Sequence, residues 1–95
     1  MAMALAGVAM PSLAARHTVV IEGMQFTPAS LTVKRGDTVV WVNKDFVAHT
    51  ATAAGRFDSG TIAANASWSH AARKTGRIDY VCTLHPMMKA TLVVE

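Results

Sequence analysis

The sequence alternates apolar and polar residues in short runs with a period of two, and none of its runs has the spacing of an amphipathic helix. The run from Thr38 to Asn43, TVVWVN, is apolar on both faces and rich in β-branched and aromatic residues, which predicts a central strand. Turn signals at Thr27-Pro28 and at Arg35-Gly36-Asp37 separate the runs. The pattern therefore predicts an all-β chain, folded as a Greek-key β-sandwich of about eight strands.

The same alternation places the other strands. Val19 and Ile21 share one face of the first strand, which Gly23 is expected to interrupt as a β-bulge before the pattern resumes at Met24 and Phe26. Further strands are expected around Leu31 and Val33, from Trp68 to Ala72, from Arg77 to Cys82 and from Ala90 to Glu95, with short strands around Phe57 and Ile62.

Length and charge narrow the function. A chain of 95 residues closes only one modest core, which excludes a multi-domain enzyme. With 52% hydrophobic and 16% charged residues, it carries enough apolar surface to fold alone, and we expect a monomer. The net charge of +3 is spread along the chain without a block of like charges, which speaks against nucleic-acid binding and suits an acidic partner protein.

The first fifteen residues differ from the rest. Residues 1–9 form an apolar run, followed by Pro11, Ser12 and small residues up to Ala15, as in the core and cleavage region of a secretory signal. The run is shorter than the roughly 20 residues of a transmembrane span. We therefore interpret residues 1–15 as a signal-peptide remnant, removed near Ala14 or Ala15, with a disordered N-terminus as the alternative. Residues 16–95 are the folded domain, and we expect the protein to be periplasmic or otherwise exported.

Cysteine usage supports a metal site. Cys82 is the one cysteine, so no disulfide bond can form within the domain, although small exported domains commonly rely on such bonds. A free thiol is a liability in an oxidising compartment unless a ligand occupies it. A bound metal ion would do so by holding the sulfur as thiolate.

The residues around this cysteine have ligand spacing. His85 follows Cys82 by three residues and Met88 follows His85 by three, all in one short loop. Thiolate, imidazole and thioether together suit copper, and blue-copper electron-transfer sites use two histidines, one cysteine and a long axial methionine. His49 fits as the second histidine because it lies just beyond the central strand, where a sandwich brings alternate strand ends to one pole. Met87 is a rival for the axial position.

These segments resemble a known family. Residues 38–50, TVVWVNKDFVAHT, and 76–95, GRIDYVCTLHPMMKATLVVE, are similar to the two ligand regions of the blue copper proteins (cupredoxins), most closely of the amicyanin and plastocyanin branch. The Cys-x-x-His-x-x-Met loop with Pro86 directly after the histidine resembles the short loop of amicyanin. The resemblance implies one copper ion per chain, held by His49, Cys82, His85 and Met88. It also implies that the side-chain amide of Asn43 ties the two ligand loops together and helps to set the hydrogen bonding of the sulfur.

The resemblance further implies the function and the way a partner approaches. A type 1 blue copper protein shuttles single electrons between redox partner proteins and is not an enzyme. In the family, the C-terminal histidine ligand has its ring edge exposed in an apolar patch, which here would comprise Pro86, Met87 and Phe46. Basic residues are expected to ring this docking face and to steer an acidic partner towards it, namely Lys44, Lys89, Arg73, Lys74 and Arg77.

Three other readings compete with electron transfer. A copper carrier or storage module would hand the ion on, and it would not cycle reversibly with its metal retained. A zinc site could use the same cysteine and histidines, and the protein would then be colourless. A hydrolase could pair the thiol of Cys82 with an imidazole base, but the sequence shows neither a third group to orient the base nor an oxyanion donor.

Overall fold

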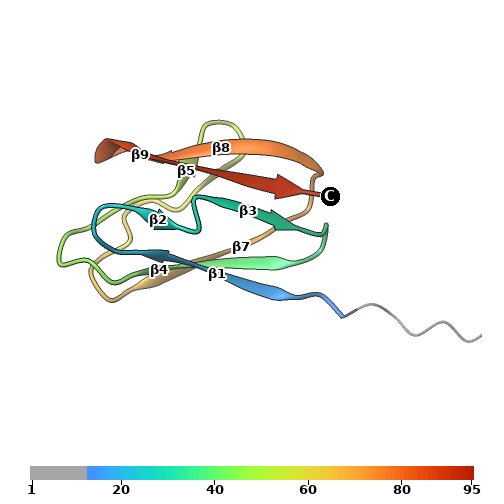
Figure 1. Ribbon diagram of the computed structural model, residues 1–95, viewed down its shortest axis with the longest axis horizontal. Helices are drawn as coiled ribbons and strands as arrows, with labels where there is room; N and C mark the ends of the chain where they lie inside the picture. Colours follow the sequence, from blue (N-terminus) through green and yellow to red (C-terminus); the bar gives the residue numbers. More distant parts are fainter. Residues whose placement is uncertain (1–12) are drawn as a thin grey trace, which may run out of the picture.

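The chain forms two β-sheets packed face to face, and a computed structural model describes residues 13–95 (Figure 1). Within this range no helix is long and apolar enough to cross a membrane. The strands are β1 (Arg16–Ile21), β2 (Phe26–Thr27), β3 (Ser30–Val33), β4 (Thr38–Asn43), β5 (Thr52–Ala53), β6 (Phe57–Asp58), β7 (Ser67–Ala71), β8 (Gly76–Cys82) and β9 (His85–Val94).

The strand order places the two predicted ligand regions in opposite sheets. One sheet has the order β2-β1-β4-β7, so β4 lies between two neighbours, as its two apolar faces predict. The other has the order β3-β9-β8-β5-β6, with β8 and β9 antiparallel. Parallel pairing of β1 with β4 and of β3 with β9 requires crossovers between the sheets, which makes the fold a sandwich.

The core lies between the inner faces of the two sheets. Trp41 on β4 is fully buried, and its ring meets that of Tyr80 on β8 edge-on, with centroids 5.5 Å apart. Phe26 and Phe57 pack against Tyr80 from either side, at 4.9 and 5.7 Å. Burial raises the pKa of Tyr80 to about 12, since the phenolate would lose its hydration there. This aromatic cluster gives β4 and β8 a fixed relative position, and each of these strands leads into one ligand region.

The first strand differs from the prediction of one bulged strand. Residues 22–25 form a turn, and β2 folds back to pair antiparallel with β1. Gly23 and Met24 both have positive φ, at 64° and 59°, which reverses the chain rather than bulging it. The Asp45 carboxylate stabilises this conformation by accepting hydrogen bonds from the N–H groups of Gly23 and Met24, at 2.7 and 3.0 Å. The bulge prediction was wrong because this support comes from a distant loop.

The last strand begins earlier than predicted. β9 starts at His85 rather than near Ala90, and the partner of His85 in the ladder is Cys82. The ladder shifts register between Val81 and Cys82, so the ligand loop is a tight irregular turn between β8 and β9. Of the two short strands expected in the middle of the chain, the one at Phe57 forms β6, while Ile62 makes only an isolated bridge to His49.

The sandwich has two ends with different roles. At one end, called the ligand end, β4 and β8 finish at Asn43 and Cys82; it is at the left of Figure 1. At the opposite end, called the distal end, the chain enters β1 and leaves β9. Leu13 to Ala15 are exposed there. Residues 1–12 of the proposed leader lie outside the described part of the chain, so the leader stays a prediction.

Candidate metal centre

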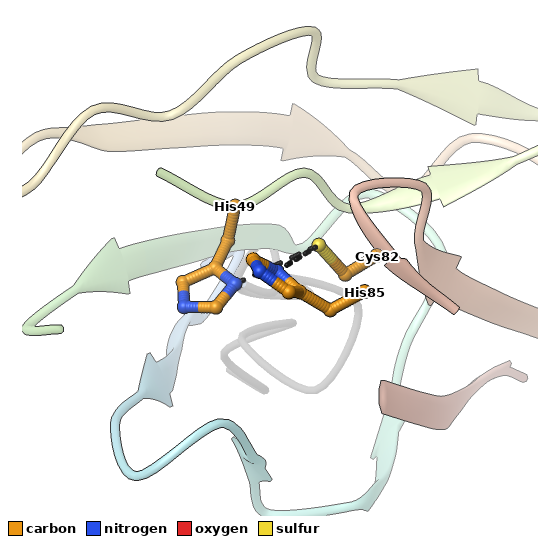
Figure 2. A group of neighbouring side chains, drawn as sticks. All are labelled: His49, Cys82 and His85. Atoms are coloured by element: carbon orange, nitrogen blue, oxygen red, sulfur yellow. Dashed lines mark hydrogen bonds between the residues drawn. The ribbon is translucent and has the colours of Figure 1, made fainter. Parts of the chain in front are cut away.

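Three of the predicted ligands converge at the ligand end. Donor atoms of His49, Cys82 and His85 lie within 4.8 Å of one another, and Figure 2 shows both imidazole rings turned towards the sulfur. His49 comes from the segment after β4, Cys82 ends β8 and His85 opens β9. Two sheets therefore supply the cluster, and its geometry depends on how the whole sandwich is packed.

The donor spacing fits one metal ion. The Cys82 Sγ lies 3.6 Å from the Nδ1 of His49 and 3.6 Å from the Nδ1 of His85. Thiolate and imidazole donors each stand about 2 Å from a bound first-row metal ion, and two such donors around a trigonal centre are separated by about 3.5 Å. The three donors thus present the soft, mixed nitrogen and sulfur set that suits copper.

His49 is locked in place by a carboxylate. Its Nε2 lies 2.8 Å from Oδ2 of Asp45, and its side chain is fully buried. Because a carboxylate only accepts hydrogen bonds, Nε2 donates the proton and the lone pair of Nδ1 faces the sulfur. Burial acts to raise the pKa of Asp45, but the hydrogen bonds from Met24, Gly23 and His49 outweigh it and lower that pKa. Sequence reasoning missed Asp45, although its i, i+4 spacing to His49 was a signal.

Cys82 accepts a hydrogen bond that the sequence did not reveal. The N–H of Thr50 points at the buried sulfur over 3.3 Å. The Oγ1 of Thr50 in turn accepts the N–H of Thr83 at 2.8 Å and contacts the hydroxyl of Thr83 at 3.0 Å. The side chain of Thr50 therefore ties the His49 segment to the cysteine loop.

Hydroxyl contacts continue outward to a surface carboxylate. The Oγ1 of Thr52 lies 3.0 Å from that of Thr50 and 3.1 Å from Oδ1 of Asp58. The hydroxyl of Thr52 is the donor in both contacts, so its single proton is shared between Oγ1 of Thr50 and Oδ1 of Asp58. Thr52 therefore connects the surface carboxylate of Asp58 with Thr50, the residue whose N–H contacts the sulfur.

The hydrogen bonds of Asn43 differ from the predicted ones. Its amide Nδ2 donates to the carbonyls of Val47 and Ile62, both at 2.9 Å, and its Oδ1 accepts from the N–H of Asp45 at 2.9 Å. These bonds shape the histidine segment, but none of them reaches the cysteine loop. The prediction that Asn43 ties the two ligand loops together is therefore corrected, because Thr50 lies between them and makes that connection.

The two candidate methionines face different surroundings. Met88 is 5% exposed and belongs to the buried core, whereas Met87 is 95% exposed. Both line a hollow of about 440 Å³ together with His85, Pro86 and Met24. The burial of Met88 favours it over the exposed Met87 as the fourth ligand.

The surface around His85 is apolar. His85 is half-buried, and Phe46 is fully exposed, as are most of Met87 and about half of Val47 and Leu84. Large apolar side chains that are exposed together at one end of a domain are typical of an interaction surface.

The cations are distributed differently from the prediction. Lys44 follows β4 and Lys89 lies in β9 near the ligand end, so both can flank the apolar surface. Arg73 and Lys74 lie in the turn before β8, and Arg77, its second residue, is about 17 Å from Cys82 at about 3.3 Å per residue. The expected ring of these three around the docking face is wrong, since β8 carries them to the distal end.

The geometry also bears on the hydrolase alternative. Asp45 supplies the orienting third group that the sequence did not show, since Cys82, His49 and Asp45 lie in line. The side chains of Cys82 and His49 are both fully buried, however, so no substrate carbonyl can reach the sulfur. The burial favours a metal ligand over a nucleophile.

Comparison with known proteins agrees with the donor set. Residues 14–95 match the family model described as copper binding proteins, plastocyanin/azurin family. Amicyanin of Paracoccus versutus is 30% identical over 85 residues, covering 79% of this chain and 61% of that protein. Amicyanin-alpha of Methylorubrum extorquens (strain AM1) is 31% identical over 87 residues, covering 81% and 70%. The chain thus spans less than two thirds of the first of these relatives.

Solved structures show the same fold. A Cu(I) form of an amicyanin variant superposes with a TM-score of 0.79 at 28% identity, covering 98% of this chain and 90% of that chain. An oxidised amicyanin variant superposes equally well, with a TM-score of 0.79 at 29% identity over 98% of this chain and 90% of that chain. The similarity extends over both sheets and the ligand end.

Proposed function

Because the chain belongs to the plastocyanin/azurin family of copper-binding proteins, we propose that it is a type 1 blue copper electron carrier in which His49, Cys82, His85 and Met88 hold one copper ion. The observation that carries the proposal is the cluster of two Nδ1 atoms, each 3.6 Å from one buried sulfur. Such a donor set is preorganised for a single soft metal ion.

The residues around the site limit its rearrangement. Copper supplies a one-electron couple between its univalent and divalent states. Asp45 fixes the ring of His49, and the N–H of Thr50 fixes the sulfur of Cys82. Donors that hardly move between the two oxidation states keep the reorganisation energy low, which favours fast electron transfer.

We assign His85 as the place where electrons enter and leave. Of the three clustered donors it is the one that is only half-buried, and it lines an apolar hollow with Pro86 and Met87. The fully exposed Phe46 follows β4 at the same end of the sandwich and is proposed to extend this surface. A partner protein that docks there brings its redox centre close to the imidazole edge. Lys44 and Lys89 beside this surface favour a partner with acidic residues at its rim.

The proposal also covers the oligomeric state and the location of the protein. The carrier works as a monomer between a donor and an acceptor protein in the periplasm or another exported compartment. The lone thiol of Cys82 supports this, since copper protects it there, and the apolar start of the sequence fits an export signal.

The test is the visible absorption spectrum after addition of Cu(II). We expect an intense thiolate-to-copper band that bleaches on reduction, returns on oxidation with the metal retained, and is absent from Cys82→Ser. Thr61→Ser, an exposed loop residue, is the matched control and keeps the band. A band that appears but does not survive one redox cycle would indicate copper carriage, and a colourless protein holding zinc would overturn the assignment.

A further inference from the structure

A second hollow lies at the distal end, remote from the metal centre. It measures about 270 Å³ and opens between the two sheets. Its walls come from β7, the turns β5–β6 and β7–β8, and the ends of β8 and β9, with these side chains: Arg56, His70, Ala71, Ala72, Arg73, Lys74, Ile78 and Val94. Proposed electron transfer at the ligand end uses none of them.

The rim of this hollow concentrates positive charge. Arg56, Arg73 and Lys74 come from two separate turns and line the same space. Within residues 13–95, none of the three forms a salt bridge. Bringing like charges together without a counterion costs electrostatic free energy, which a bound anion would recover.

Among the described residues, no carboxylate forms an ion pair with the cations of the rim. The carboxylate of Asp37 is occupied by the N–H groups of Ala15 and Lys34 and by His17, at 2.9 to 3.0 Å. Glu95 follows Val94 and is exposed, without a salt-bridge partner among the described residues. The positive rim is therefore open to an anion from solution.

The floor of the hollow is apolar. Ala72, Ile78 and Val94 line it, and each is at most 5% exposed. Phosphate has no apolar part that could pack on this floor. The hydrocarbon part of an organic acid would be removed from water there, which favours its binding.

One wall is a neutral aromatic surface. The His70 ring stacks on Trp68 at an interplanar angle of 18°, and it lies 4.8 Å from the ring of Phe57. Burial, and next the charge of Arg73, lower the pKa of His70, so the imidazole is neutral at pH 7. A neutral ring adds a hydrogen-bonding group without adding to the repulsion at the rim.

We propose that this hollow binds a small organic anion, a carboxylate on a short apolar body. Arg56, Arg73 and Lys74 hold the carboxylate through charge-assisted hydrogen bonds. The apolar body rests on the floor formed by Ala72, Ile78 and Val94. The volume is below that of the usual drug-sized site, which limits the ligand to a few carbon atoms beyond its acid group.

The experiment is a titration of the full chain with sodium hexanoate, followed by NMR. We expect saturable shifts of the Ala72, Ile78 and His70 signals, and a rise in the pKa of His70 when the anion binds beside it. Acetate should bind at least about tenfold more weakly, because it lacks the methylene groups that contact the floor. The copper site need not be loaded, so the result does not depend on the proposed electron transfer.

Single substitutions distinguish binding at this hollow from a general attraction of anions to a positively charged protein. Arg73→Gln and Arg56→Gln change exposed side chains and should each weaken hexanoate binding at least about tenfold. Arg77→Gln is the matched control, since Arg77 lies on the outer face, 3.3 Å from Asp79, and should leave binding unchanged. Equal shifts with inorganic phosphate, an equal loss in the control, or no saturation with hexanoate would each overturn the proposal.

Discussion

At the scale of single residues, Asp45 links two parts of the ligand end. Its carboxylate accepts hydrogen bonds from the N–H groups of Gly23 and Met24 and from the imidazole of His49. The substitution Asp45→Ala removes the hydrogen bond that orients the ring of His49, together with the two hydrogen bonds that stabilise the β1–β2 turn. We expect copper affinity to fall about 10- to 100-fold, as is typical when a partner of a ligating histidine is lost.

Competition with a chelator of known affinity measures this loss. Asp79→Ala is the control, since among the described residues that carboxylate bonds to Arg77 on β8 and Thr91 on β9, away from the metal centre. Equal affinities for the wild type and Asp45→Ala would show that the packing of His49 alone fixes its ring.

The side chain of Thr50 should stabilise the fold even when no metal is bound. In Thr50→Val, the N–H of Thr83 loses its acceptor, and leaving a part-buried donor unpaired costs about 1 to 3 kcal/mol. Urea unfolding of the copper-free protein measures this difference. Thr32→Val, at an exposed position of β3, should change the free energy of unfolding little. Equal effects of the two changes would refute the role given to the hydroxyl.

The convergence of His49, Cys82 and His85 could be predicted from the sequence, while the contacts that support these side chains could not. Cys82 and His85 lie three residues apart on one turn, so local spacing brings their side chains together. The supports join segments that are far apart, as with Thr50 and Thr83, which are 33 residues apart. Threonine and aspartate are common surface residues, so their types alone indicate no such contacts.

At the scale of elements, Asp37 joins the start of β1 to the turn before β4. Hydrogen bonding from His17 is the main cause that lowers the pKa of Asp37 to about 2, and the N–H groups of Lys34 and Ala15 add to it. A carboxyl with a lowered folded-state pKa stabilises the fold fully above its unfolded pKa of about 4. That stabilisation is lost as the pH falls towards 2.

We therefore expect Asp37→Asn to be less stable than the wild type at pH 6 and to approach it near pH 2. Urea unfolding at both pH values measures the difference. Glu22→Gln, at an exposed position, is the control and should change stability little. A difference that is the same at both pH values would show that Asp37 acts through shape rather than charge.

The sequence predicts a strand correctly where the residues of that strand alone determine its conformation and its buried face. TVVWVN forms the internal strand β4, and the alternation of Ile78, Tyr80 and Cys82 gives the buried face of β8. The prediction failed at Gly23 and at His85, where hydrogen bonds to another element decide whether the chain turns or continues. Period-two alternation reports which side of a strand is buried, but not which strand lies beside it.

At the scale of the whole molecule, the cations are segregated. All Lys and Arg residues except Lys44 and Lys89 lie towards the distal end, in or next to β1, the turns β3–β4, β5–β6 and β7–β8, and the start of β8: Arg16, Lys34, Arg35, Arg56, Arg73, Lys74 and Arg77. The Debye length is about 10 Å at 0.1 M salt, so these charges act weakly on a reactant at the ligand end.

This distribution predicts which lysines affect electron exchange. Lys44→Gln and Lys89→Gln should each slow oxidation of the reduced copper protein by ferricyanide roughly two- to fivefold at low salt, since they weaken attraction of the anion. Lys74→Gln removes the same charge at the distal end and should leave the rate unchanged. Stopped-flow kinetics at several salt concentrations measure the rates, and an equal effect at both ends would contradict the exit of the electron through His85.

The unequal burial of the donors separates how tightly the metal is held from how quickly it exchanges. His49 and Cys82 are fully buried and fixed by Asp45 and Thr50, so they set the affinity. His85 opens β9 beside exposed Pro86 and Met87, so it is the most accessible of the three clustered donors. We therefore expect changes in the β8–β9 turn to alter the rate of metal exchange more than the affinity, since a competing chelator would approach from the same accessible side as the proposed redox partner.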